Sequence, residues 1–181
     1  MPTAADAAIA AIAYVALHAG HQIGDHVVQT KAAAAAKGAP TAERLAAGVH
    51  PWTGWTACAT HVSTYVLVQA LALGAVRLVA PLDVHGAVAA LAVSASTHAV
   101  IDRRWLVRAL IRAKRCEDWP DAPYLLDQSL HQGALLVAAL TATVTSINAS
   151  AVTILAALGL IAVALAIEYR RSAAVPRVLE R

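Results

Sequence analysis

The sequence contains no phenylalanine and few charges: of its 181 residues only 14% are charged, whereas 59% are hydrophobic. A soluble domain carries roughly 25% charged residues to cover its surface, so this composition excludes an ordinary soluble protein. Cysteine is also scarce. The two cysteines, Cys58 and Cys116, have no partner at the spacing of a zinc knuckle. A zinc finger is therefore excluded.

A secretory signal peptide is not expected either. Such a peptide would begin with a basic region, but the only early charge is Asp6. The apolar run Ala7–Leu17 then leads into His18, His21 and Asp25 rather than into a cleavage site. We therefore interpret this segment as part of the working protein.

Long apolar segments dominate the rest of the chain, whose mean hydropathy is +0.61. Each clear segment is close to the roughly 20 residues that a bilayer core requires; the segments are Trp55–Ala80, Val84–Ile101, Tyr124–Ile147 and Ala151–Ile167. Ala7–Val28 is a weaker candidate, with a re-entrant or interfacial helix as the alternative. Pro81 and Asn148 mark turns between spans. The sequence thus predicts one all-α integral membrane domain, residues 1–181, with about five transmembrane helices.

The basic residues predict the orientation in the membrane. Of the 14 Lys and Arg residues, only Arg77 falls on the side opposite to the others. The positive-inside rule then places the N-terminus outside and the C-terminus in the cytoplasm. The formal charge of +3 is explained by this topology, so no nucleic-acid partner is expected.

The segment Arg103–Arg115 is basic and partly amphipathic, with an apolar side that includes Trp105 and Ile111. This pattern predicts a basic interfacial helix that contacts anionic membrane lipid. A basic flank that stops translocation is the simpler alternative, and the two interpretations are compatible.

Histidine and aspartate recur at one predicted depth of the membrane. The first span carries His18, His21 and Asp25 on one helical face, and the second begins near His61. Further pairs, four residues apart, end the third span and open the fourth; they are His98 with Asp102, and Asp127 with His131. Four helices therefore bring imidazoles or carboxylates to the same level.

Ionisable groups inside membrane spans are costly and usually face a cavity or one another. Imidazole and carboxylate together suit Zn, Mn or Fe, and the group is large enough for one or two ions. The predicted metal ligands are His21, Asp25, His98, Asp102, Asp127 and His131. His18 and His61 are further ligands or a general base in catalysis. A proton or ion pathway and a structural hydrogen-bond network remain alternatives.

Other polar residues near this group have smaller predicted roles. His26 follows Asp25 and is expected on a neighbouring helix face, outside the metal's immediate ligands. Gln29 and Gln128 flank the group and could bind a ligand or a substrate. His85 is expected to face solvent at the outer end.

The same residues carry a resemblance to DUF3307, a family of small bacterial and phage membrane proteins. They read His21-Gln-Ile-Gly-Asp25 with Gln29, His61 with Tyr65, His98-Ala-Val-Ile-Asp102, and Asp127-Gln128-Ser-Leu-His131. The resemblance covers about residues 18–133 and implies a bacterial inner-membrane protein without naming an activity. The arrangement is more distantly similar to membrane-bound metal-dependent hydrolases of the YdjM type.

These observations favour a membrane-embedded, metal-dependent hydrolase that acts at the cytoplasmic headgroup level, on an ester or phosphoester of a lipid. A transporter or a proton pathway is the first alternative, since His and Asp chains also bind transported ions. The second is a non-enzymatic membrane protein in which a metal only holds helices together. Its sign would be a closed set of ligands.

Overall fold

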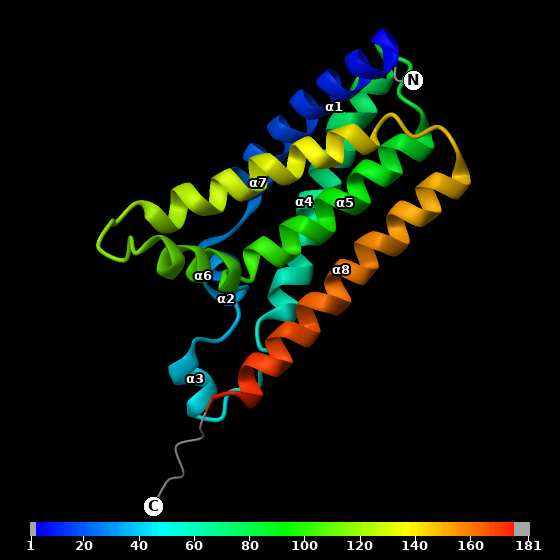
Figure 1. Cartoon of the computed structure of the whole chain (residues 1–181). Helices are drawn as coiled ribbons and strands as arrows, with labels where there is room; N and C mark the ends of the chain where they lie inside the picture. The colour runs from blue at the N-terminus through cyan, green and yellow to red at the C-terminus, as the bar shows by residue number, and fades with distance from the viewer. Residues whose placement is uncertain (1–2, 176–181) are drawn as a thin grey trace, which may run out of the picture.

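The computed structural model describes residues 3–175, and within this range the chain forms helices and no strand. Five long helices lie side by side (Figure 1), namely α1 (Ala4–Ile23), α4 (Trp55–Arg77), α5 (Val84–Asp102), α7 (Ala122–Thr141) and α8 (Ile147–Ala173). A π-helical turn, Gly24–Val28, extends α1. Three short helices lie in the connections, α2 (Lys31–Ala36), α3 (Ala42–Ala46) and α6 (Trp105–Lys114). The all-α prediction is confirmed.

Four helices are long and apolar enough to cross a membrane: Ala4–Val28, which joins α1 to its π-helical turn, α4, α5 and α8. α7 is not among them, so the fifth span stays a prediction. The predicted turn at Asn148 is wrong, because this residue lies inside α8. The Ser146 side chain accepts a hydrogen bond from the backbone N–H of Ala149 and so caps α8 at its start. α7 accordingly ends at Thr141, before the predicted end of that span.

α5 is the central helix and packs against α4, α7 and α8, while α1 packs against α4 and α7. The core at one end of the bundle is rich in alanine, including Ala13, Ala90 and Ala138, all fully buried. Small residues let helix backbones approach closely in a membrane. Gly86 shows the same effect, because a Cβ at this position would overlap the backbone carbonyl of Ala142. This end of the bundle is therefore closely packed and apolar.

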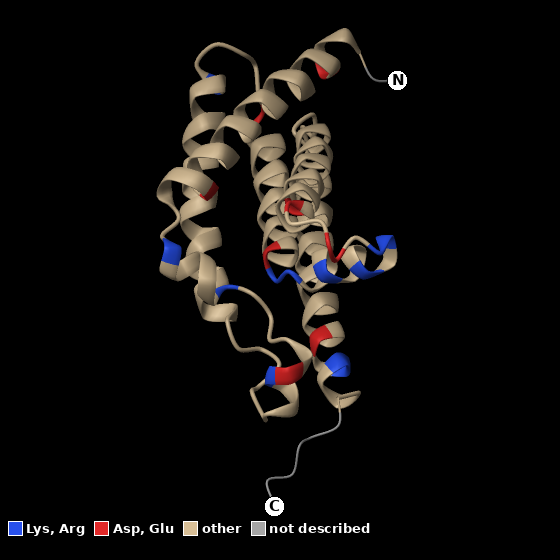
Figure 2. Ribbon diagram, turned by 90° about the vertical axis from the view of Figure 1, so that its left-hand side faces the viewer, with Lys and Arg blue, Asp and Glu red and all other residues tan. Residues whose placement is uncertain are grey.

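Charge gathers at the opposite end of the bundle. Figure 2 shows most Lys and Arg in its lower half, around α2, α3, α6 and the last turns of α8. Arg177 and Arg181, which belong to the predicted charge pattern, lie outside the described residues.

Arg103 is a fully buried arginine at the end of α5. Its Nε and Nη2 donate to the Glu168 carboxylate over 2.8 and 3.0 Å, and its guanidinium lies 4.8 Å from the centre of the Trp55 ring. It also donates to the backbone carbonyls of Lys37 and Thr53 over 2.8 and 2.9 Å. Arg103, at the end of α5, therefore links the segment between α1 and α4 to α8. Because its side chain is buried, it cannot face lipid headgroups.

Two further arginines hold the same connection. Arg104 donates to the carbonyl of Ala34 over 2.9 Å, and Arg108 donates to that of Ala39 over 3.0 Å. Gly54 closes the connection from the other side with a φ of 92°, and a Cβ there would lie 2.6 Å from a neighbouring carbonyl oxygen. The segment from α2 to residue 39 is thus anchored across the charged end of the bundle.

Candidate metal centre

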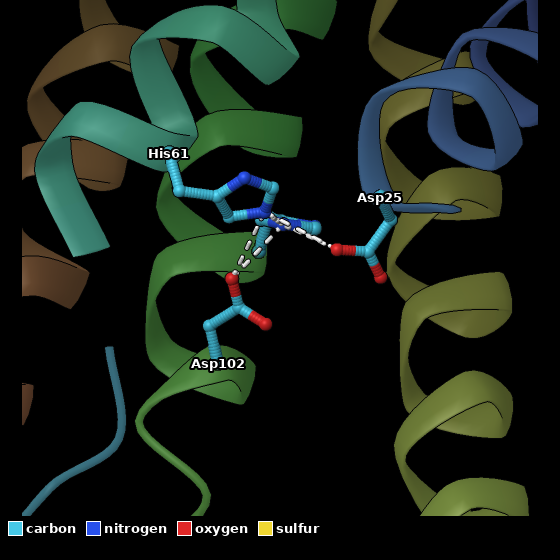
Figure 3. Close-up of side chains that lie close together, drawn as sticks. Asp25, His61 and Asp102 are labelled. Carbon is cyan, nitrogen blue, oxygen red and sulfur yellow. Dashed lines mark hydrogen bonds and ion pairs between the residues drawn. The ribbon is translucent and has the colours of Figure 1, made fainter. Parts of the chain in front are cut away.

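Four of the conspicuous polar residues converge at the charged ends of three helices. Asp25 comes from the π-helical turn, His61 from α4, and His98 and Asp102 from consecutive turns of α5. Figure 3 shows the carboxylates of Asp25 and Asp102 pointing toward the His61 ring from two sides. We call these four residues the cage.

The distances between the cage donors are short and similar. The His61 Nε2 atom lies 3.0 Å from His98 Nε2, 3.2 Å from Asp25 Oδ1 and 3.4 Å from Asp102 Oδ2. The His98 Nε2 atom lies 3.1 Å from Asp102 Oδ2 and 3.9 Å from Asp25 Oδ1. A tetrahedral ion with bonds of about 2.0–2.2 Å separates its ligand atoms by about 3.3–3.6 Å. The cage therefore has the size of a tetrahedral metal site.

The protonation of the two cage imidazoles also fits a cation. Two protonated nitrogens could not approach to the 3.0 Å that separates His61 Nε2 from His98 Nε2. At least one of them therefore presents a lone pair beside two carboxylates. The Nδ1 atoms of both rings and Asp102 Oδ2 are buried without a hydrogen-bond partner among the described residues. The two Nε2 atoms and the carboxylate oxygens that face them, rather than the Nδ1 atoms, form the nitrogen and oxygen donor set that suits Zn, Mn or Fe.

Lys37 stands beside the cage, and the sequence analysis assigned it only a role in topology. Its Nζ lies 2.7 Å from Asp102 Oδ1 and 3.4 Å from Asp25 Oδ1, and its side chain is almost fully buried. The Lys37 ammonium therefore contacts Asp102 through the oxygen that does not face the imidazoles. It pairs with both carboxylates and leaves Asp102 Oδ2 facing the cage.

A buried cycle of hydrogen bonds among Tyr65, Ser94 and Gln69, which we call the polar ring, lies behind the cage on the side of the bundle core. The Tyr65 ring stacks on His98, with centroids 3.8 Å apart. Its hydroxyl lies 3.1 Å from Ser94 Oγ, which donates to Gln69 Oε1, and Gln69 Nε2 donates back to the Tyr65 oxygen and to the Leu17 carbonyl. The network orients His98, and Gln69 was not expected in it.

A partly open pocket of about 450 Å³ lies beside the cage. Its lining includes both cage carboxylates, Lys37, Arg104, Arg108, Gln29 and Gln128, with Val107, Ile111 and Pro123 as an apolar side. Burial, together with Arg171 and Arg104, lowers the pKa of the Arg108 guanidinium. The pocket is thus amphiphilic, and cations crowd its rim.

The other predicted site residues lie around the cage rather than in it. His131 packs its ring 4.5 Å from that of His98 and 4.9 Å from that of His21, measured between centroids. The Asp127 carboxylate accepts a hydrogen bond from the side chain of Gln128 on the same helix, and one of its oxygens lies 3.4 Å from His131 Nδ1. Asp127 also lines the pocket. His18 is half-buried, and its Nδ1 lies 2.9 Å from the side-chain oxygen of Gln132. The structure therefore brings His61 into the cage and leaves four predicted site residues outside it, namely His18, His21, Asp127 and His131.

The π-helical turn changes the expected place of His26. An α-helix would carry His26 to a neighbouring face from His21, but a π-helix closes its hydrogen bonds over five residues. The two rings accordingly face each other edge-on with centroids 6.2 Å apart. His21, Asp25 and His26 each offer a ligand atom within 4.8 Å of the other two. This second group shares Asp25 with the cage.

A comparison with protein families identifies the relatives of this chain. The model of DUF3307, described as a protein of unknown function, matches residues 13–159. No curated protein and no solved structure matches the chain. Since the matched range takes in the cage, the polar ring behind it and most of the bundle, the chain belongs to the DUF3307 family.

Proposed function

We propose that this protein is a membrane-embedded, metal-dependent hydrolase that cleaves a lipid ester or phosphoester at the headgroup level. The observation that carries the proposal is the contact between the cage and the pocket, since Asp25 and Asp102 belong to both. A divalent ion in the cage would supply Lewis acidity and an activated water.

The shape and charge of the pocket support a lipid as the substrate. Arg104, Arg108 and Lys37 offer positive charge for a phosphate or a carboxylate. Val107 and Ile111, on the apolar side of the same pocket, suit the start of an acyl chain. A headgroup with its tails is amphiphilic in the same way.

A structural metal is the second candidate, and the closed geometry of the cage favours it. Four protein donors already complete a tetrahedral shell, as in metal sites that only stabilise a fold. Hydrolysis would need room for water and substrate beside the ion, and the pocket adjoins the cage at Asp25 and Asp102.

A transporter receives support from the polar ring of Tyr65, Ser94 and Gln69, which extends from the cage into the bundle. Beyond Gln69, however, the described core is apolar and includes Leu73, Val76 and Leu82. An ion that reached Gln69 would meet a closely packed hydrocarbon barrier. The hydrolase therefore accounts better for a site at one end of the bundle.

We further propose that the chain lies in the bacterial cytoplasmic membrane with its N-terminus outside and α7 as a fifth crossing. Fusion to alkaline phosphatase should then give activity at the N-terminus, and fusion to green fluorescent protein should give fluorescence at the C-terminus. A fusion after Arg77, the one basic residue expected outside, serves as an internal control. Reporters that place both termini in one compartment would mean an even number of crossings, so that either the weak first span, Ala7–Val28, or α7 does not cross.

The hydrolase is tested with the full chain in lipid nanodiscs loaded with Zn or Mn. Mixed phospholipids and phosphoester headgroup analogues are the substrates, and mass spectrometry detects cleavage. We expect turnover that falls to background with a chelator and in acid, because histidine ligands bind metal only when deprotonated. His98→Ala should also fall to background.

The alternatives give different results in the same preparation. Metal that is retained without cleavage of any substrate would favour a structural ion. Metal-dependent solute flux in proteoliposomes, again without cleavage, would select the transporter.

A further inference from the structure

A second group of metal-ligating side chains lies at the pocket; it shares Asp25 with the cage and adds two histidines that the cage does not use. His26 and Asp25 line the pocket, and His21 lies directly behind them. His21 is fully buried, its Nε2 is 3.2 Å from Gln128 Oε1, and its Nδ1 is buried without a hydrogen-bond partner among the described residues. A buried imidazole nitrogen without a partner loses hydration and gains nothing in return. A cation bound here would supply that missing partner.

Local backbone geometry gives this group its shape. Gly24–Val28 is the single π-helical turn in the described chain, and it follows directly after α1. Such turns are rare and are often found at functional sites, since they cost regular hydrogen bonding. Its effect here is to direct both Asp25 and His26 toward the side of His21. The turn therefore adds His26 to the pair formed by His21 and Asp25, which gives three possible metal ligands.

We propose that His21, Asp25 and His26 bind a second divalent metal ion, with Asp25 bridging it to the ion in the cage. Two-metal hydrolases hold their ions about 3.5–4 Å apart, which a shared carboxylate allows. The second site has three protein ligands and adjoins the pocket, so it keeps positions for water and substrate. The closed cage then stabilises the centre, and the open site meets the substrate.

The charge of this centre points to the class of substrate. Two divalent ions and Lys37 outweigh the carboxylates of Asp25 and Asp102, and Arg104 and Arg108 add further positive charge at the rim. A net positive, partly buried centre is stabilised by an anionic ligand. A phosphoester therefore fits better than a neutral ester. This part of the inference rests on the proposed hydrolase function, whereas the number of ions is measured without turnover.

The test loads the full chain in nanodiscs with manganese alone. Elemental analysis of the wild type should give about two ions per chain, and electron paramagnetic resonance should show the broadened signal of two coupled Mn ions. His26→Ala should bind about one ion and give the six-line signal of an isolated ion. The His26 side chain is exposed, so its removal should leave the fold intact. His85→Ala, which changes a histidine far from the pocket, should behave as the wild type.

Each outcome separates this inference from the function proposed above. A wild type that binds a single ion, lost in His98→Ala, would overturn the second site and leave the cage standing. Two ions retained in His26→Ala would also overturn the assignment. A wild type that binds no manganese, zinc or iron would overturn both proposals. Loss of phosphate-ester turnover in His26→Ala, with one ion retained, would support the open site as the place of chemistry.

Discussion

His98→Ala is expected to empty the cage, so that the purified protein loses about one divalent ion per chain and the cage affinity falls at least about a hundredfold below that of the wild type. Loss of a partner that only orients a ligand already costs about 10–100-fold, and His98 Nε2 itself lies within 3.9 Å of three other donors. Asp102→Ala should have the same effect, with an added loss of stability because Lys37 loses its closest carboxylate. Elemental analysis and metal titration provide the measurement.

The same helix offers a matched control. His85 lies in the first turn of α5, is about one-third exposed and pairs with Asp83 at the other end of the bundle. His85→Ala should keep the metal content of the wild type. Equal metal content in His98→Ala and the wild type, in a protein that still elutes as a folded particle, would eliminate the cage as a metal site.

Arg103→Leu is expected to lower the free energy of unfolding by roughly 3–5 kcal/mol, as for other buried ion pairs that lose one partner. The reason is that Glu168 would stay buried with its charge, and the carbonyls of Lys37 and Thr53 would lose their donor. Glu168→Leu should cost a similar amount. The double variant should cost less than the sum of the two, because no unpaired charge remains. Thermal unfolding in detergent, followed by circular dichroism, measures all three.

An exposed arginine of the same region serves as the control. Arg112 lies on the outer side of α6, and Arg112→Ala should change stability by less than about 0.5 kcal/mol. If the loss of unfolding free energy in the double variant equalled the sum of the two single losses, Arg103 and Glu168 would act independently. The proposed link between Arg103 and α8 would then be wrong.

Hydropathy is enough to predict the helical bundle, because a bilayer span needs a long apolar run whatever its neighbours are. Helix ends are harder. The polar residues from Thr141 to Asn148 contain several possible boundaries, and only the cap formed by Ser146 decides between them. The short helices α2 and α3 gave no hydrophobic signal. Each begins at a threonine cap, Thr30 or Thr41, and the arginines hold only the segment from α2 to residue 39.

Spacing predicted the pairs within one helix but not which helices meet. His98 and Asp102 are neighbours on α5 by periodicity alone, and the structure has both in the cage. The exclusion of Asp127 and the inclusion of His61 depend on how α4 and α7 rotate against α5, which a single sequence does not reveal. Lys37 carried no periodic signal, because it lies in a connection. His26 lies nearer to His21 than an uninterrupted α-helix would place it, because Gly24–Val28 is a π-helical turn that the sequence pattern did not reveal.

The cage also constrains the order in which the protein can assemble. Its ligands come from α1, α4 and α5, so no two neighbouring helices contain it completely. When α1 enters the membrane, Asp25 has neither the imidazoles nor Asp102 to share a cation with, and an unpaired carboxylate in a span is unfavourable. Folding in membranes proceeds by insertion of helices followed by their association. The unpaired carboxylate at the end of α1 therefore remains unfavourable until α5 packs beside it. Completion of the centre then favours association of the helices.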